Sequence, residues 1–280
     1  MDLDFVRGLR QAELELALTE IASRKPAGSS VVEIGGGGGW QARMLADAGF
    51  AVRSFDLAGS QFSAHRVFPI EDYDGHSIPA ADAAFDIAFS SNVLEHIAHG
   101  RAFQAELHRV LKPDGIAVHL LPTASWRLWT LAAHYPWLVK SGSGVVRAWL
   151  GGGGPSEDAA VVARAAGRRG KAELLRRVVV SPRHGEVGNA VSELWHFSRH
   201  RWTPLFEDTG WRAVARDTNG LFYTGYSVLG WQLSLAARRR LSRLLGASCH
   251  VYVLEKASAS RATNASAPLA AETARGKASQ

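Results

Sequence analysis

A run of five glycines, Gly35 to Gly39, constrains this chain more than any other feature. It follows Val31-Val32-Glu33-Ile34, whose β-branched residues predict a short buried strand, and it precedes a helix expected over 41–48. Glycine tolerates positive φ and lets a ligand approach the backbone closely, while the N-terminus of the next helix offers free N–H groups. We therefore expect a nucleotide-type pocket here rather than a low-complexity linker.

An acid after the second predicted strand indicates that the ligand contains a ribose. This strand is predicted over 51–55, and Asp56 follows it at about the spacing of an acid that binds ribose hydroxyls. Sites for NAD, FAD and S-adenosylmethionine all contain such a unit. These residues alone therefore leave the cofactor open.

Three later motifs narrow the choice of cofactor. They are Asp74-Gly75-His76-Ser77-Ile78-Pro79, the stretch from Phe85-Asp86 to Leu94-Glu95-His96, and Leu107-His108-Arg109-Val110-Leu111-Lys112-Pro113-Asp114-Gly115. With the glycine loop they resemble the small-molecule, type 11-like branch of the class I S-adenosylmethionine-dependent methyltransferases. The resemblance covers about residues 30–122, with weaker similarity at 195–217 and 247–256. It implies an α/β, Rossmann-like sheet of seven strands with strand seven antiparallel, helices on both faces and a lid insertion.

The resemblance also implies which residues bind S-adenosyl-L-methionine: Glu33, Gly35, Gly37, Gly39, Asp56, Leu57, Asp74, Ser90 and Asn92. Asp56 would bind the ribose, and Asp74 would accept a hydrogen bond from the adenine amino group. Asp72 is a near competitor of Asp74, and both acids could instead be ordinary turn residues. Ser90 and Asn92 are expected at the carboxyl end of strand four, where ligands bind in open α/β sheets.

Histidines supply the candidate catalytic groups. His96 follows strand four and could deprotonate a hydroxyl, although a structural role for the Leu94-Glu95-His96 triplet is as consistent with the sequence. His196 is a second candidate catalytic residue, and His184 and Glu186 are candidate substrate-binding residues. A set of five residues invites a metal interpretation, but its spacing is not that of a compact zinc site, so no metal is expected. The set is His184, Glu186, Glu193, His196 and His200.

The predicted organisation has five parts. They are an N-terminal helical segment (1–29), the cofactor-binding core (30–122), a lid or substrate insertion (123–203), the C-terminal part of the core with a helical insertion (204–256) and a disordered tail (257–280). Within the core we expect a short helix over 59–64, strand three over 65–69, a helix over 102–111 and strand five over 116–121. The triplet 113–115 should form a turn. The helical insertion should hold a helix around 228–244, and strands six (211–217) and seven (247–255) should pair antiparallel.

Charge is distributed unevenly. Residues 1–122 hold 10 Lys/Arg and 16 Asp/Glu, whereas residues 123–280 hold 22 and 10. Such asymmetry fits either an anionic partner or solvated helix faces. The Arg238-Arg239-Arg240 run could contact an anionic membrane, or it could simply end a covering helix. A single cysteine, Cys249, excludes an internal disulfide, and no signal peptide is visible, so we expect a cytoplasmic and possibly membrane-peripheral protein.

The function expected from these features is methyl transfer to a small or medium organic acceptor, for example a hydroxyl of a glycan, lipid or secondary metabolite. A nucleic-acid methyltransferase using the basic half is an alternative, although no RNA-binding module is recognisable. Ser91-Asn92-Val93-Leu94 also differs from the N-P-P-Y motif of amide-methylating relatives. A non-catalytic, membrane-peripheral cofactor-binding protein is a third possibility, and an NAD oxidoreductase fits least. No obligate protein partner is expected.

Overall fold

The computed structural model describes residues 3–60, 66–149, 181–226 and 230–257. Its centre is a seven-stranded sheet with the order β3-β2-β1-β4-β5-β7-β6. The strands are β1 (Ser30–Ile34), β2 (Ala51–Leu57), β3 (Ile70–Tyr73), β4 (Phe85–Ser91), β5 (Leu111–Pro122), β6 (Trp211–Thr218) and β7 (Cys249–Lys256). The first five strands run parallel, and β7 is antiparallel to both β5 and β6. The predicted fold class is confirmed.

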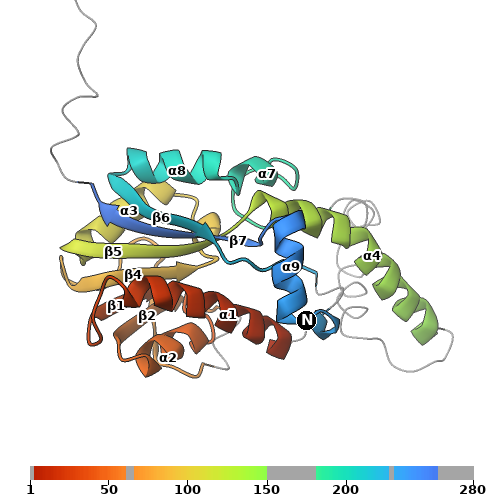
Figure 1. The fold of residues 1–280 in the computed structure, drawn as a ribbon, viewed down its shortest axis with the longest axis horizontal. Helices are drawn as coiled ribbons and strands as arrows, with labels where there is room; N and C mark the ends of the chain where they lie inside the picture. Colours follow the sequence, from red (N-terminus) through yellow and green to blue (C-terminus); the bar gives the residue numbers. More distant parts are fainter. Residues whose placement is uncertain (1–2, 61–65, 150–180, 227–229, 258–280) are drawn as a thin grey trace, which may run out of the picture.

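Helices cover both faces of this sheet (Figure 1). They are α1 (Leu3–Ala22), α2 (Trp40–Asp47), α3 (Gly100–Val110), α4 (Ala124–Trp149), α7 (Glu193–His196), α8 (Arg199–Asp208) and α9 (Leu235–Leu245), with short 3-10 helices η2 (Leu94–His96) and η3 (Gly230–Gln232). Helices α1 and α2 pack on one face, while α3 and α8 pack on the other. Within the described residues, no helix combines the length and the apolar character that crossing a membrane requires.

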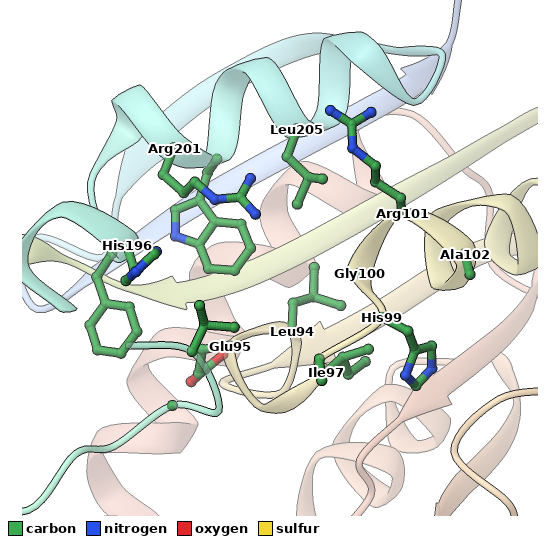
Figure 2. A pocket seen from close by; sticks show the side chains of 15 residues that line it. Leu94, Glu95, Ile97, His99, Gly100, Arg101, Ala102, His196, Arg201 and Leu205 are labelled. Carbon is green, nitrogen blue, oxygen red and sulfur yellow. The ribbon is translucent and has the colours of Figure 1, made fainter. Parts of the chain in front are cut away.

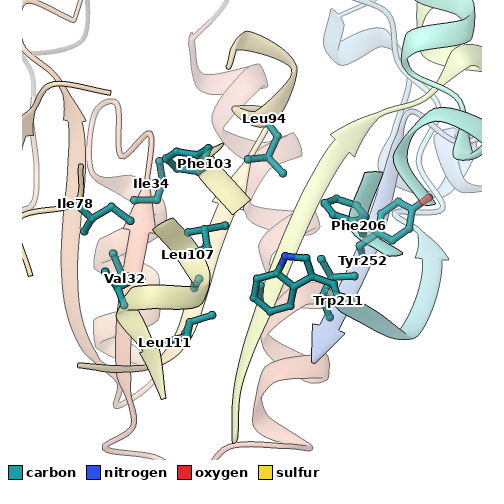
Figure 3. Close-up of a cluster of buried hydrophobic side chains, with 14 of the residues drawn as sticks. Val32, Ile34, Ile78, Leu94, Phe103, Leu107, Leu111, Phe206, Trp211 and Tyr252 are labelled. Carbon is teal, nitrogen blue, oxygen red and sulfur yellow. The ribbon is translucent and has the colours of Figure 1, made fainter. Parts of the chain in front are cut away.

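The core on the α3 and α8 face contains the inward side chains of the central strands. Val32 and Ile34 of β1 are buried there with Phe103 and Leu107 of α3 (Figure 3). Alternate residues of β1 face the opposite side, where Val31 is buried against α1 and α2. A parallel strand with helices on both sides is apolar on both sides, which explains why apolar residues flank Glu33 in the stretch that predicted this strand.

Helix α1 is joined to the rest of the domain at two points. Near its N-terminus, the Arg7 guanidinium carbon lies 3.9 Å from the ring centroid of Trp40, the first residue of α2. Farther along, the buried Glu13 accepts hydrogen bonds from Asn219 (2.7 Å) and from the Tyr223 hydroxyl (2.5 Å). The helix therefore bridges the start of α2 and the segment after β6.

Strand three lies later than predicted. It is Ile70–Tyr73, paired in parallel with 54–57 of β2, and not 65–69. Residues 66–69 instead run back against the glycine loop, where Val67 N donates to Gly38 O (2.9 Å) and Phe68 contacts Gly39. Most of the short helix predicted over 59–64 lies outside the described residues.

The predicted turn at 113–115 is part of strand β5. Helix α3 ends at Val110 and β5 begins at once, but the pairing shifts from Phe85 with Leu111 to Ile87 with Ile116. The strand therefore bulges where Pro113, which lacks an N–H, could not continue a regular ladder.

The predicted lid insertion begins with the long helix α4, which leaves the sheet edge and extends away from it (Figure 1). Its first turns contact α9, because Trp129 Nε1 donates to Leu245 O (2.9 Å). Helix α9 starts at Leu235, later than predicted, because Ser234 caps its N-terminus by accepting from Ala237 N (3.2 Å). Residues 150–180 of the predicted lid and the predicted disordered tail beyond Ala257 lie outside the described residues.

Candidate functional site

The glycine loop is fixed to strand β2 by backbone hydrogen bonds. The N–H groups of Gly35 and Gly36 both donate to Phe55 O, at 2.7 and 3.1 Å. Gly35, Gly37 and Gly39 have φ of 77°, 55° and 80°, a region that side chains other than glycine rarely adopt. A Cβ on Gly36 would overlap Ser54 Oγ, so the loop lies directly on the neighbouring strand.

Glu33 supports this loop from below. Its side chain is buried and accepts a hydrogen bond from Ser54 Oγ at 2.5 Å. Desolvation outweighs that hydrogen bond and raises the pKa of Glu33 to about 7. Its role in cofactor binding stays a prediction, and the contacts place the carboxylate between β1 and β2 beneath Gly36.

Asp56 lies across from the loop, and its contact with the ribose stays a prediction. Its Oδ2 accepts from Gly37 N (3.0 Å), and its Oδ1 accepts from Leu57 N (2.8 Å). The exposed Leu57 side chain is in turn close to Gly75, because a Cβ there would lie 3.0 Å from Leu57 Cδ2. The structure thus brings Asp56, Leu57 and the turn that begins at Asp74 to one edge of the sheet.

Asp74 forms this turn. Its Oδ1 accepts from His76 N (2.7 Å) and Ser77 N (2.8 Å), and the bonds from Ser77 and His76 lower the pKa of the exposed carboxyl. Asp72 differs, because its carboxylate pairs with Arg66 at 3.0 Å. Asp74 is therefore a turn residue, and its contact with the adenine stays a prediction.

The two residues predicted at the end of β4 have different surroundings. Ser90 is buried, and its Oγ is hydrogen-bonded to His119 Nδ1 (2.8 Å). Burial lowers the pKa of His119 to about 3. Asn92 has φ of 55°, and its N–H donates to Leu120 O (2.8 Å), so the chain turns out of the sheet at this residue. The Asn92 amide donates to Ser91 Oγ (3.2 Å) and accepts from Cys249 Sγ (3.6 Å), and a cofactor contact of Ser90 or Asn92 stays a prediction.

Immediately after this turn, Glu95 and His96 meet His184, which comes from the predicted lid. His96 Nε2 lies 3.9 Å and His184 Nε2 lies 3.8 Å from Glu95 Oε1. The Glu95 side chain has no solvent exposure, and its two carboxylate oxygens have no hydrogen-bond partner among the described residues. Burial is the main reason that the pKa of His96 is lowered.

A buried ion pair holds His184 in this position, and sequence reasoning missed it. Glu193 Oε1 accepts from the N–H groups of His184 and Gly185, each at 2.7 Å. Its other oxygen lies 2.8 Å from Arg127 Nε, and both side chains are almost completely buried. Burial lowers the pKa of Arg127, and Glu193 opposes that effect. The only signal in the sequence was an arginine within the apolar first half of α4.

A cavity of about 330 Å³ lies beside this cluster, between η2, the start of α3, α7 and α8. Glu95, His99, Arg101, His196 and Arg201 are among its lining residues (Figure 2). Arg101 is also paired with an acid of α8 at 2.8 Å. The candidate catalytic residue His196 therefore lines a cavity.

The two predicted substrate residues are separated. His184 joins Glu95 and His96, whereas the Glu186 carboxylate lies 3.3 Å from Arg183 at the surface. The backbone N–H of Glu186 donates to Glu95 O (3.0 Å), so this residue helps to attach the loop to η2. Substrate binding by either side chain stays a prediction.

Comparison with known proteins adds to this geometry. A family model described as a methyltransferase domain matches residues 6–149. An uncharacterized methyltransferase of Mycobacterium avium is 36% identical over 100 residues, which are 33% of this chain and 39% of that protein. One of Mycobacterium tuberculosis is 32% identical over 103 residues, 34% of this chain and 40% of that protein. The matched part thus spans about two fifths of these relatives.

Solved structures show the same fold. One is a complex between the Haloferax volcanii Trm112 methyltransferase activator and a putative methyltransferase, with a TM-score of 0.51 and 15% identity over 90% of this chain and 92% of that chain. Another is a putative S-adenosylmethionine-dependent methyltransferase from Listeria monocytogenes, with a TM-score of 0.50 and 13% identity over 90% of this chain and all of that chain. At such identities the likeness concerns the fold alone.

Proposed function

The chain belongs to the methyltransferase-domain family, and we propose that it is an S-adenosylmethionine-dependent methyltransferase that methylates a hydroxyl of a small or medium organic acceptor. The observation that carries this proposal is the cavity beside Glu95. Its volume of about 330 Å³ is at the small end of ligand pockets and suits a compact acceptor, such as a sugar, a hydroxylated lipid headgroup or a secondary metabolite.

The residues around the glycine loop fit the cofactor by their chemistry. Asp56 offers a carboxylate opposite Gly37, suited to ribose hydroxyls, and Asp74 offers an exposed carboxylate beside the apolar Leu57. Asn92 offers an amide at the carboxyl end of β4. These residues would hold S-adenosylmethionine, which supplies an intrinsically electrophilic methyl group.

The protein's own contribution is alignment and proton removal. The acceptor oxygen must be held in line with the methyl group, which is the part that the residues of α7, α8 and η2 lining the cavity would play. A hydroxyl must also lose its proton. His196 lines the cavity and is the first candidate proton acceptor, with His96, the neighbour of the lining residue Glu95, as the second.

The first test concerns cofactor binding. Calorimetric titration with S-adenosylmethionine should give micromolar affinity for the wild type, a loss of at least about tenfold for Asp56→Ala and little change for Asp72→Ala. The last variant is the matched control, because Asp72 is paired with Arg66 rather than with the glycine loop. Equal affinity of all three proteins would refute the assignment of Asp56.

The second test concerns the acceptor. Methyl transfer from labelled cofactor should be screened against pools of glycans, hydroxylated lipids and aromatic alcohols, and against RNA and DNA. Incorporation into an alcohol that falls about 10²-fold or more in His196→Gln, and not in the surface control His200→Gln, would support the proposal. Salt-sensitive methylation of nucleic acid with no small-molecule product would replace it with the nucleic-acid alternative.

A further inference from the structure

We propose that Glu95, His96 and His184 bind a divalent transition-metal ion next to the acceptor cavity. One ligand atom from each of the three residues lies within 4.8 Å of the other two. The set combines two imidazoles and one carboxylate, which are ligands that Zn²⁺, Mn²⁺, Fe²⁺ and Co²⁺ accept. It unites two consecutive residues after β4 with a lid residue far along the chain.

The Glu95 carboxylate is the observation that points to a cation. Its side chain is fully buried, and neither oxygen has a hydrogen-bond partner among the described residues. The nearest basic atoms, Nε2 of His96 and of His184, are 3.9 and 3.8 Å away, which is too far for hydrogen bonds. Buried carboxylates are normally paired, hydrogen-bonded or bound to a metal. Glu95 has no hydrogen bond from the described residues, and its two histidine neighbours are too far away for a close ion pair.

The geometry is close to that of a metal site. Ligand atoms at about 2.1 Å from a tetrahedral ion lie about 3.4 Å apart, only a few tenths of an ångström less than the two histidine–carboxylate distances. The side chains of His96 and His184 are 40% and 36% exposed, so small ring rotations can close the difference. Their exposed side leaves room for further ligands such as water or an acceptor oxygen.

The surroundings hold the ligands in place. Glu193 accepts the backbone N–H groups of His184 and Gly185, and Gly185 approaches η2 so closely that a Cβ would lie 2.8 Å from Glu95 O. The Trp126 ring packs edge-on against the His184 ring with centroids 4.7 Å apart. A supporting shell of this kind is what orients metal ligands in known sites.

A metal at this position would lower the pKa of an acceptor hydroxyl bound to it and so favour the nucleophilic alkoxide. The proton would pass to His196, which lines the cavity, because His96 bound to the ion could not accept it. This use of the ion rests on the proposed hydroxyl acceptor, whereas binding of the ion does not.

Metal binding is tested without any turnover. The full-length, metal-stripped protein is titrated with Co²⁺ by visible absorption and with Zn²⁺ by calorimetry. We expect one equivalent to bind at micromolar affinity or tighter, with losses of about 10²-fold or more in Glu95→Gln, His96→Gln and His184→Gln. His200→Gln, an exposed histidine outside the cluster, serves as the control and should bind as the wild type does.

Two results would overturn the site. One is no stoichiometric binding of either ion by the wild type. The other is unchanged affinity in the two histidine variants, which would indicate adventitious binding elsewhere. If Glu95→Gln does not fold, as shown by circular dichroism, the histidine variants decide, because both side chains are partly exposed.

The site and the proposed function fail separately. Stoichiometric binding without methylation of any alcohol would refute the hydroxyl acceptor and leave the metal site intact. Methylation at the same rate in the stripped and loaded protein would refute only the catalytic use of the ion.

Discussion

Replacing Glu193 by alanine should cost more stability than replacing any surface acid, because it breaks the buried pair with Arg127. The two side chains are 0% and 2% exposed and their charged atoms are 2.8 Å apart. Removing one partner of such a pair costs about 3–5 kcal/mol, because the remaining charge stays buried. Arg127 keeps neutral partners in Ala190 O (3.1 Å) and Pro182 O (2.8 Å), which favours the lower half of that range. For a domain of this size, the melting temperature should fall by about 10 °C.

Thermal and urea unfolding of Glu193→Ala measure this cost directly. Glu255→Ala is the control, because the Arg212–Glu255 pair is exposed and should contribute at most about 1 kcal/mol. Glu193→Gln should lie between the two, since its amide oxygen can still accept from His184 and Gly185. A melting temperature of Glu193→Ala within about 2 °C of the wild type would refute the reasoning.

Three further outcomes follow from the structure. Gly36→Ala should abolish cofactor binding and lower the melting temperature, because its Cβ would overlap Ser54 Oγ. The control Gly100→Ala should be tolerated in the same calorimetry and thermal melts, since its Cβ would lie 3.9 Å from the nearest side chain. Hydrogen bonds from lysine and serine partners outweigh burial and lower the pKa of Asp86 to about 2, so the ionised carboxylate contributes about 1–2 kcal/mol to the free energy of unfolding above pH 4. This contribution is lost between about pH 4 and 2, and Asp86→Asn should therefore lose less stability against urea over that range. Burial raises the pKa of the Cys249 thiol, so a thiol reagent should modify it only after unfolding, and rapid reaction of the native protein would contradict this.

Much of the cofactor-binding core (30–122) could be predicted, because the residue patterns that indicate its strands and loop are local in sequence. The apolar run of β1, the positive φ at Gly35 and the position of Asp56 all depend on residues close in sequence. Strand three was misplaced for the converse reason. Residues 65–69 include two apolar side chains, but the edge strand is Ile70–Tyr73, where Glu71 is held across the strands by Arg53 at 2.7 Å. Residues 66–69 are instead bonded to the glycine loop through Val67 N and Gly38 O, so their apolar side chains do not mark a strand.

The contacts of the predicted lid (123–203) could not be predicted in the same way. His184 is held near Glu95 by Glu193, which accepts its N–H and pairs with Arg127, a residue 66 positions earlier in the chain. No periodicity or motif in the sequence indicates such a contact. The spacing argument against a metal site also used only histidines and acids of the predicted lid. The proposed metal ligands Glu95 and His96 precede the lid and His184 belongs to it, so only the three-dimensional structure brings them together.

Three arginines of the second half have local structural roles. Arg127 and Arg238 are buried, and Arg238 donates to three backbone carbonyls, including Phe222 O at 3.0 Å and Gly230 O at 2.6 Å. Arg238 therefore does not belong to an exposed basic run with its two neighbours. Arg216 pairs with an acid of α8 at 2.9 Å. Positive charges that fix buried carbonyls or neighbouring helices need no polyanionic partner, so the charge asymmetry is weaker support for a nucleic-acid acceptor than composition alone suggests.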